Sequence, residues 1–162
     1  MSLLASQFAY KAWAGRELFA AVARLPEATR HPLLRVLNHI RVVDGIFMAH
    51  LQGQPHGFAA TNTPETPSLE VLASDQASID TWFADQLPLW DEAAMAEALQ
   101  FRFTDGDTGC MTRAEILQHL LAHGAYHRGA VGQMLRDAGQ PPPRDLFTRY
   151  LHETEPQRRH TR

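Results

Sequence analysis

The chain has 162 residues, of which 44% are hydrophobic, and this size and composition suit one domain with a single core. The formal net charge of -3 leaves no excess of Lys and Arg to neutralise a nucleic-acid backbone or an anionic membrane surface. No apolar run approaches the roughly 18 residues of a membrane span, and the single cysteine, Cys110, excludes an intrachain disulfide. We therefore expect a cytoplasmic protein that binds neither nucleic acid nor membrane.

Two long helices are predicted in the first third of the chain. Apolar residues recur at helical spacing from Ser2 to about Leu25, and Pro26 then stops that helix. Pro32 suits the first turn of a second helix, whose apolar pattern continues until Gly53. These two segments favour a helical domain.

A loop, a third helix and a hairpin are predicted next. Segment 53–67 holds three Pro together with Thr, Asn and Gly, a composition typical of a loop. Helical spacing resumes from Ser68 to about Leu87. After Pro88, the stretch LQFRFTDGDTG alternates apolar and polar residues before an Asp-Gly turn signal, which predicts a short β-hairpin.

The fourth long helix is expected to begin at a capping box. The side chains of Thr112 and Glu115 can each satisfy a free backbone N–H at a helix start. This helix should run to about Asp137, because Gly139 and then three prolines, 141–143, follow it.

The C-terminal part is predicted to hold one more helix. It should run from Arg144 to His152 and pack back on the bundle, while the polar residues 155–162 form a flexible tail. The predicted fold class is therefore all-α. Residues 1–154 form a four-helix bundle, with a short hairpin before the fourth long helix and a short C-terminal helix.

Two histidines share the core-facing stripe of the fourth long helix. At about 100° per residue, His123 and His127 fall on one narrow stripe with Ile116 and Leu120. They are one turn apart, about 6 Å along the axis, so both imidazoles can converge on one metal ion. His119 falls at the edge of the stripe, and we expect it to pack around the ligands rather than join them.

A third ligand is needed, because a catalytic zinc-type site commonly takes three protein ligands and leaves one position open. His39 and His50 share an inward stripe of the second helix, but they lie about 16 Å apart along its axis and cannot both reach one ion. We favour His39, which lies mid-helix among apolar residues. His50 lies beside the helix end and the loop, where it can line the mouth of a pocket.

Spacing alone leaves two interpretations open. A histidine on an apolar face is often a core residue that is hydrogen-bonded to a carbonyl. Three histidines on facing stripes favour a metal instead, because an ion satisfies the ring lone pairs that burial would otherwise leave unpaired. A di-iron bundle is disfavoured, since the chain holds no Glu-x-x-His pair.

Two stretches around these histidines match a known pattern. They are HLLAHGAYHRGAVGQMLRDAGQPPPRD, from His119 to Asp145, and LNHIRVVDGIF, from Leu37 to Phe47. Both are similar to the DinB-like, or YfiT-like, family of bacterial four-helix-bundle proteins, and the His-Gly-x-Tyr-His-Arg-Gly stretch is the specific part. The resemblance covers nearly the whole chain.

The resemblance implies a metal site and a class of chemistry. In that family a histidine of the second helix and two of the fourth bind a divalent ion, usually zinc or nickel, and these positions match His39, His123 and His127. Characterised relatives include thiol-dependent transferases and an isomerase that uses low-molecular-weight thiols. We therefore expect a transferase that acts on a small-molecule thiol and an electrophile. A metal-dependent hydrolase and a non-catalytic stress-response or ligand-binding protein are the alternatives.

A stripe of small residues lies on the opposite face of the fourth long helix, and it allows close approach by another helix. That helix can belong to the same chain or to a second copy in a homodimer, and the spacing favours neither. The stripe comprises Ala122, Ala125, Gly129 and Gly132.

Other residues carry narrower expectations. Arg128 is expected to pair with an acid or the hairpin, and Asp44 to be either solvated or paired. Tyr126 can offer a hydroxyl near the pocket, although a buried tyrosine bonded to backbone is commoner. Cys110 has no basic neighbour that would make it a nucleophile. The tryptophans Trp13, Trp82 and Trp90 are expected in the core or a pocket wall.

Overall fold

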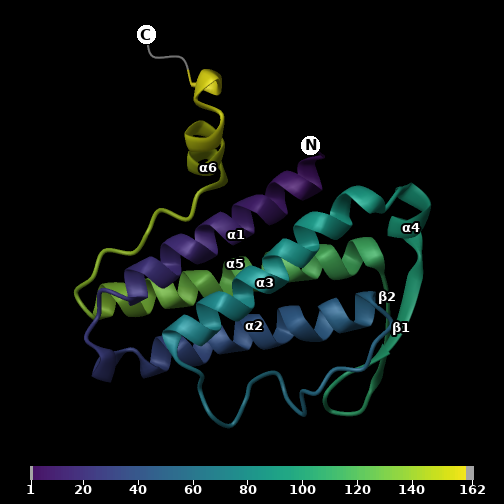
Figure 1. The fold of residues 1–162 in the computed structure, drawn as a ribbon, viewed down its shortest axis with the longest axis horizontal. Coiled ribbons are helices and arrows are strands. Elements are labelled where there is room, and N and C mark those ends of the chain that lie inside the picture. The colour runs from purple at the N-terminus through teal and green to yellow at the C-terminus, as the bar shows by residue number, and fades with distance from the viewer. Residues whose placement is uncertain (1, 160–162) are drawn as a thin grey trace.

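The computed structural model describes residues 2–159, and four long helices dominate it (Figure 1). They are α1 (Leu3–Val22), α2 (His31–Leu51), α3 (Leu69–Gln86) and α5 (Arg113–Asp137). A two-stranded hairpin and a short C-terminal helix complete the fold, so the predicted fold class is confirmed. The smaller elements are η1 (Glu27–Thr29), η2 (Leu87–Leu89), α4 (Glu92–Ala96), β1 (Ala98–Arg102), β2 (Thr108–Thr112), α6 (Phe147–Thr154) and η3 (Pro156–Arg158).

Side-chain caps define where the long helices begin. The predicted capping box of α5 is present: Glu115 N donates to Thr112 Oγ1 at 3.2 Å, and Thr112 N donates to Glu115 Oε2 at 2.7 Å. Ser2 and Ser68 cap α1 and α3 in the simpler way, each accepting a bond from the backbone three residues later. These caps satisfy N–H groups that have no partner inside the helix.

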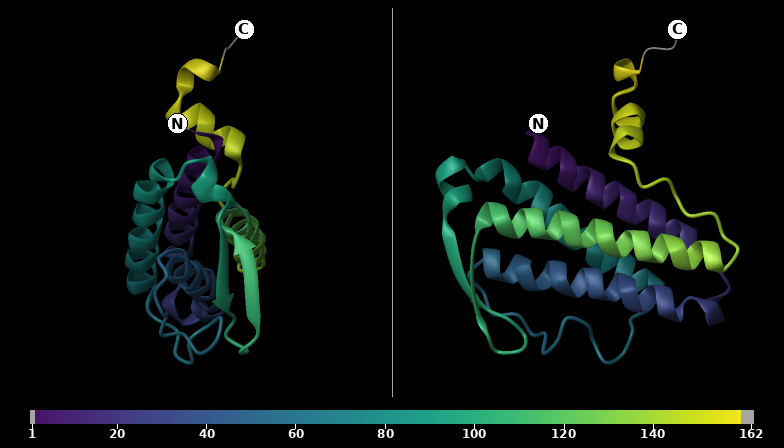
Figure 2. Two further views of the ribbon diagram at one scale, coloured as in Figure 1. Left: turned by 90° about the vertical axis from the view of Figure 1, so that its right-hand side faces the viewer. Right: turned by 180° about the vertical axis from the view of Figure 1, so that it is seen from behind.

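The long helices form a square in which α1 packs on α3 and α5, and α2 packs on the same two helices. Helices α1 and α5 run in one direction and α2 and α3 in the other (Figures 1 and 2). Since α2 and α3 are parallel, the connection between them must return along the whole bundle. This explains the long loop predicted at residues 53–67.

The core consists of two apolar clusters with polar side chains between them. One cluster lies toward the hairpin and includes Phe47, Phe83 and Leu120; the other lies at the opposite end and includes Leu72 and Val131. Between these layers the helices carry polar side chains that are also buried, among them Lys11, Asp44, Gln76 and Arg128. The predicted metal ligands lie at the same level of α2 and α5.

The predicted β-hairpin is present and closes one end of the bundle. Strands β1 and β2 pair antiparallel, with Phe101 opposite Gly109. The turn places Gly106 at a φ of +99°, a conformation that favours glycine. Gly109 has a separate role, since a Cβ there would lie 2.7 Å from the Phe101 ring. That close approach lets Phe101 pack against Phe47 of α2 at 5.5 Å between ring centroids.

The C-terminal helix differs from its predicted bounds. It begins at Phe147 rather than Arg144, because Asp145 is tied to the bundle and Leu146 is extended. It ends at Thr154, and the turn η3 follows within the segment predicted as a flexible tail. Residues 160–162 of that predicted tail lie outside the described residues.

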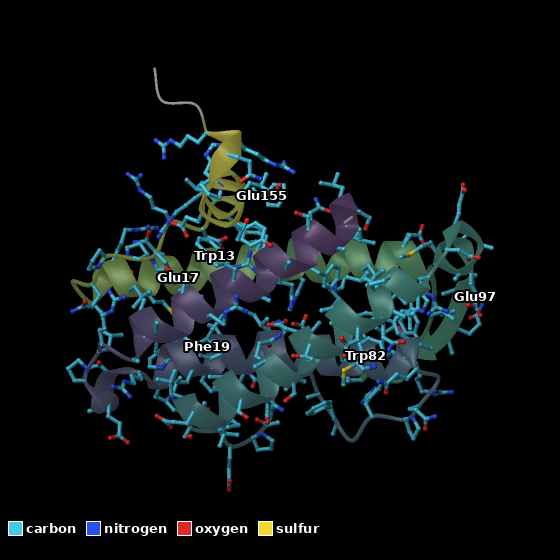
Figure 3. All side chains as sticks on the ribbon, turned by 45° about the horizontal axis from the view of Figure 1, so that its top comes forward. Trp13, Glu17, Phe19, Trp82, Glu97 and Glu155 are labelled. Carbon is cyan, nitrogen blue, oxygen red and sulfur yellow. The ribbon has the colours of Figure 1, made fainter. Side chains whose placement is uncertain are left out.

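Figure 3 shows α6 standing over α1, with Trp13 at their junction. The Trp13 ring lies 5.9 Å from that of Tyr150, between centroids. Trp82 packs on Phe83 near the hairpin end and contacts Trp90. All three tryptophans are half-buried, as expected for residues of a wall.

Helix α4 was not predicted. Its five residues are too few to show a helical period, although Asp91 caps it by accepting a bond from Ala94 N at 2.8 Å. Over residues 2–159, none of the helices combines the length and the apolar character needed to cross a membrane.

Candidate metal centre

The structure brings His39, His123 and His127 together where α2 and α5 pack side by side. Ring centroids lie 4.8 Å apart for His39 and His123, 4.5 Å for His39 and His127, and 4.4 Å for His123 and His127. Each ring offers one nitrogen, and these nitrogens all lie within 4.8 Å of one another. His39 of α2 is about equally far from His123 and His127, and therefore lies level with the space between these two successive turns of α5.

The neutral tautomer of His39 is fixed by a backbone carbonyl. Its Nδ1 lies 2.7 Å from the carbonyl oxygen of Thr61, which can only accept a hydrogen bond. Nδ1 therefore carries the proton, and in the neutral ring Nε2 keeps its lone pair. That Nε2 lies 3.0 Å from Nε2 of His123, so the free lone pair of His39 points into the cluster.

Burial keeps the two imidazoles of α5 neutral. Burial, together with the neighbouring rings of His127 and His39, lowers the pKa of His123 to about 3. Burial and then His39 also lower the pKa of His127. Neutral imidazoles are the form that binds a metal ion, because their lone pairs are not occupied by protons.

The geometry fits a transition-metal ion. Ligand nitrogens about 2.0–2.1 Å from a tetrahedral zinc ion lie about 3.3 Å apart, close to the 3.0 Å between the Nε2 atoms of His39 and His123. The cluster as described contains no carboxylate or thiol, so an ion bound there would keep its full positive charge.

Comparison with known proteins assigns the chain to a family. The model of the DinB family matches residues 1–159. This chain belongs to the DinB family. The family resemblance inferred from the sequence is therefore confirmed, and its histidine positions form a three-histidine cluster that could hold a metal ion.

A curated member of the DinB family is similar over almost the whole length. Protein DinB of Bacillus subtilis (strain 168) is 23% identical over 160 residues, covering 91% of this chain and 93% of the relative. The similarity therefore spans nearly the full length of both chains. No solved structure matches this chain.

Two further histidines of this DinB-family chain, His119 and His50, lie in a row of rings beside the cluster. His119 lies 5.5 Å from His123 and 5.2 Å from Phe47, between ring centroids, so it packs around the ligands as expected. His50 stacks on Phe101 at 4.9 Å. A row of imidazole and phenyl rings thus extends from the three-histidine cluster to Phe101 in the hairpin.

Tyr126 corrects one expectation. Its side chain is 76% exposed, so it is not a buried tyrosine bonded to backbone. Its ring lies edge-on to His127, with centroids 5.0 Å apart. Because α5 turns by about 100° per residue, Tyr126 points outward while His127 points toward α2.

Two charged residues that the sequence left open are paired. Asp44 is fully buried and accepts a bond from Lys11 Nζ at 2.5 Å. Burial alone would lower the pKa of Lys11, but the carboxylates of Asp44 and Asp80 outweigh it and raise that pKa. Arg128 donates from Nε to Asp145 Oδ2 at 2.7 Å, so its partner is an acid and not the hairpin.

The small-residue stripe of α5 is mostly open to solvent. Ala122, Ala125 and Gly129 are exposed, while Gly132 is buried near Pro142. Of these four small residues, only Gly132 therefore packs within the chain.

Cys110 lies on β2 and is exposed.

Sequence reasoning missed Lys11, Asn38 and the contribution of the 53–67 loop. Lys11 follows Phe8 by three residues, so its place on the apolar stripe of α1 was a visible sign that it would need a partner. Asn38 is also fully buried, one residue before His39. No periodic pattern in the loop predicts that Thr61 would meet His39.

Proposed function

We propose that this protein holds one divalent metal ion on His39, His123 and His127 and transfers a low-molecular-weight thiol to an electrophile. The observation that supports this proposal is the convergence of three imidazole nitrogens from two helices, within 4.8 Å of one another. Zinc and nickel suit such a donor set, because imidazole is a borderline ligand for both. Three protein ligands leave a position for a small molecule.

The chemistry that such an ion supplies is positive charge, which lowers the pKa of a thiol or water at the open position. The protein's own groups hold and orient the site. His39 is oriented by the Thr61 carbonyl, and the His123 ring is held against both other ligands. Phe47 and His119 supply a wall against which an apolar electrophile can pack. With an activated thiol as the nucleophile, no protein nucleophile is required.

Hydrolysis has less support from the described residues. A hydrolase needs a general base within hydrogen-bond reach of the attacking water, and carboxylates serve this role in many metal enzymes. The cluster as described contains histidines only. The remaining alternative is a protein that binds metal and ligand without turnover.

Metal content tests the site. In protein purified without a metal-affinity step, elemental analysis should find about one divalent ion per chain, and His123→Ala or His127→Ala should abolish it. His152→Ala on α6 is the matched control and should retain the metal. Equal metal content in all four proteins would remove the proposed site.

Thiol consumption tests the reaction. Metal-loaded protein should consume a low-molecular-weight thiol in the presence of an electrophile, and protein stripped by a chelator should not. If metal content is confirmed but no common bacterial thiol gives metal-dependent turnover, the non-catalytic alternative is favoured.

A further inference from the structure

The loop between α2 and α3 is hydrogen-bonded to α2 beside His39, one of the three clustered histidines. Arg35 Nη1 donates to the Thr63 carbonyl at 2.5 Å, and Asn62 Nδ2 donates to the Arg35 carbonyl at 3.0 Å. One residue earlier in the loop, the Thr61 carbonyl lies 2.7 Å from Nδ1 of His39. Residues 61–63, here called the clasp, therefore touch α2 at three successive positions.

Asn38 anchors the clasp from inside the bundle. Its side chain is fully buried, and its amide donates to Asn62 Oδ1 and, at 2.6 Å, to Thr63 Oγ1. Its own Oδ1 accepts bonds from Arg41 at 2.9 and 3.2 Å, and Arg41 is paired with Asp75 of α3. A polar chain thus runs from α3 through α2 to the clasp.

The clasp has more hydrogen bonds to α2 than a loop needs merely to connect two helices. Burying an asparagine is costly unless its groups are bonded, and here Arg41 bonds the side-chain oxygen of Asn38 while both partners of its amide are clasp residues. Because residues 61, 62 and 63 are consecutive, fixing the last two also fixes the carbonyl of Thr61. That carbonyl decides which nitrogen of His39 is free to bind a metal.

We propose that the clasp is a positioning device for the metal site, in which Asn62 and Thr63 hold the Thr61 carbonyl on His39 so that metal binding and clasp docking are coupled. The inference rests on the proposed three-histidine site. Coupling between two equilibria is reciprocal, so a docked clasp strengthens metal binding and a bound metal stabilises the docked clasp. Partners that orient ligating histidines typically change metal affinity by about 10- to 100-fold.

Metal affinity of clasp variants gives the first test. Asn62→Ala should weaken Co²⁺ binding about 10- to 100-fold and alter the visible absorption spectrum of bound Co²⁺, which reports ligand geometry. Thr63→Val, which removes a hydroxyl with little change of shape, should shift both in the same direction, and Thr63→Ser should restore them. Thr81→Val is the matched control, since Thr81 Oγ1 also bonds a backbone carbonyl, that of Ala77, far along the chain on α3.

Hydrogen exchange gives the second test, and its main measurement uses the wild-type protein alone. Saturating Zn²⁺ should slow amide exchange in peptides that contain residues 61–63, and Thr63→Val should reduce this protection. The coupling is wrong if Zn²⁺ leaves clasp exchange unchanged, or if Asn62→Ala and Thr63→Val bind Co²⁺ with wild-type affinity and spectrum. If the wild-type chain itself binds no Co²⁺, the metal site and the clasp inference are both wrong, an outcome distinct from failure of the clasp alone.

Discussion

Lys11 and Asp44 place opposite charges in the middle of the bundle, at 4% and 0% exposure. Gln76 Nε2 adds a bond to the same Asp44 oxygen at 2.8 Å, and Asp80 lies 3.4 Å from Lys11. Removing two charges from water is costly, and the pair is tolerated because each charge compensates the other.

The pair gives a prediction for single and double substitutions. Asp44→Asn and Lys11→Met should each lower the free energy of unfolding by about 3–5 kcal/mol, because each takes the nearest opposite charge away from a buried charge. The double variant Lys11→Met with Asp44→Asn should lose less than the two single losses added together, since both members of the buried pair are then uncharged and Asp80 keeps its bond from Gln76 Nε2 at 3.1 Å. Urea denaturation followed by circular dichroism measures all three, and additive losses would contradict this account.

At the scale of elements, α6 is attached to α1 by aromatic packing of Phe147 and Tyr150 and by one carboxylate that precedes the helix. Asp145 accepts bonds from Arg128 of α5 and from the Tyr10 hydroxyl of α1, just before α6 begins. Burial and the bond to Asp145 raise the pKa of Tyr10 to about 12. The residues that attach α6 therefore come from three separate parts of the chain.

Replacing that carboxylate should loosen α6 without removing the bundle. Asp145→Asn should bring the pKa of Tyr10 down from about 12 toward the ordinary tyrosine value of 10.0, so part of the rise in tyrosinate absorbance would move to lower pH. Limited proteolysis should also cut the 140–146 segment faster. An unchanged tyrosine titration would show that burial alone sets the Tyr10 pKa.

At the scale of the whole molecule, the three histidines come from α2 and α5, which are separated in the chain by α3, α4 and the hairpin. A metal ion on His39, His123 and His127 would crosslink α2 to α5 across the polar layer between the two apolar clusters. Because the unfolded chain cannot keep these rings together, binding should favour the folded state.

Thermal unfolding measures this linkage. Zn²⁺ at about 100 times its Kd should add about 2.7 kcal/mol of stability, which for a chain of this size raises Tm by roughly 5–10 °C. His39→Ala should abolish the rise, while His152→Ala should keep it. A Zn²⁺-induced rise of equal size in the His39→Ala variant would mean that the metal stabilises the fold from another site.

The sequence by itself determined the local elements and the helices that carry the site. The capping box at Thr112, the Asp-Gly turn of the hairpin and the histidine stripes are patterns among residues close in the chain, where sterics and backbone hydrogen bonds decide the outcome. The start of α6 is an instructive exception. Its predicted first residue, Arg144, lies in an extended segment because Asp145 is bonded to Arg128.

Only the tertiary structure decided which partners these side chains find. Lys11 and Asp44 are 33 residues apart, and His39 and the Thr61 carbonyl are 22 apart. Such contacts depend on how the helices pack and how a long loop returns along them, and several pairings satisfy the same sequence pattern. The pattern therefore places imidazoles on two inward faces, while the packing of α2 on α5 brings their nitrogens to one point.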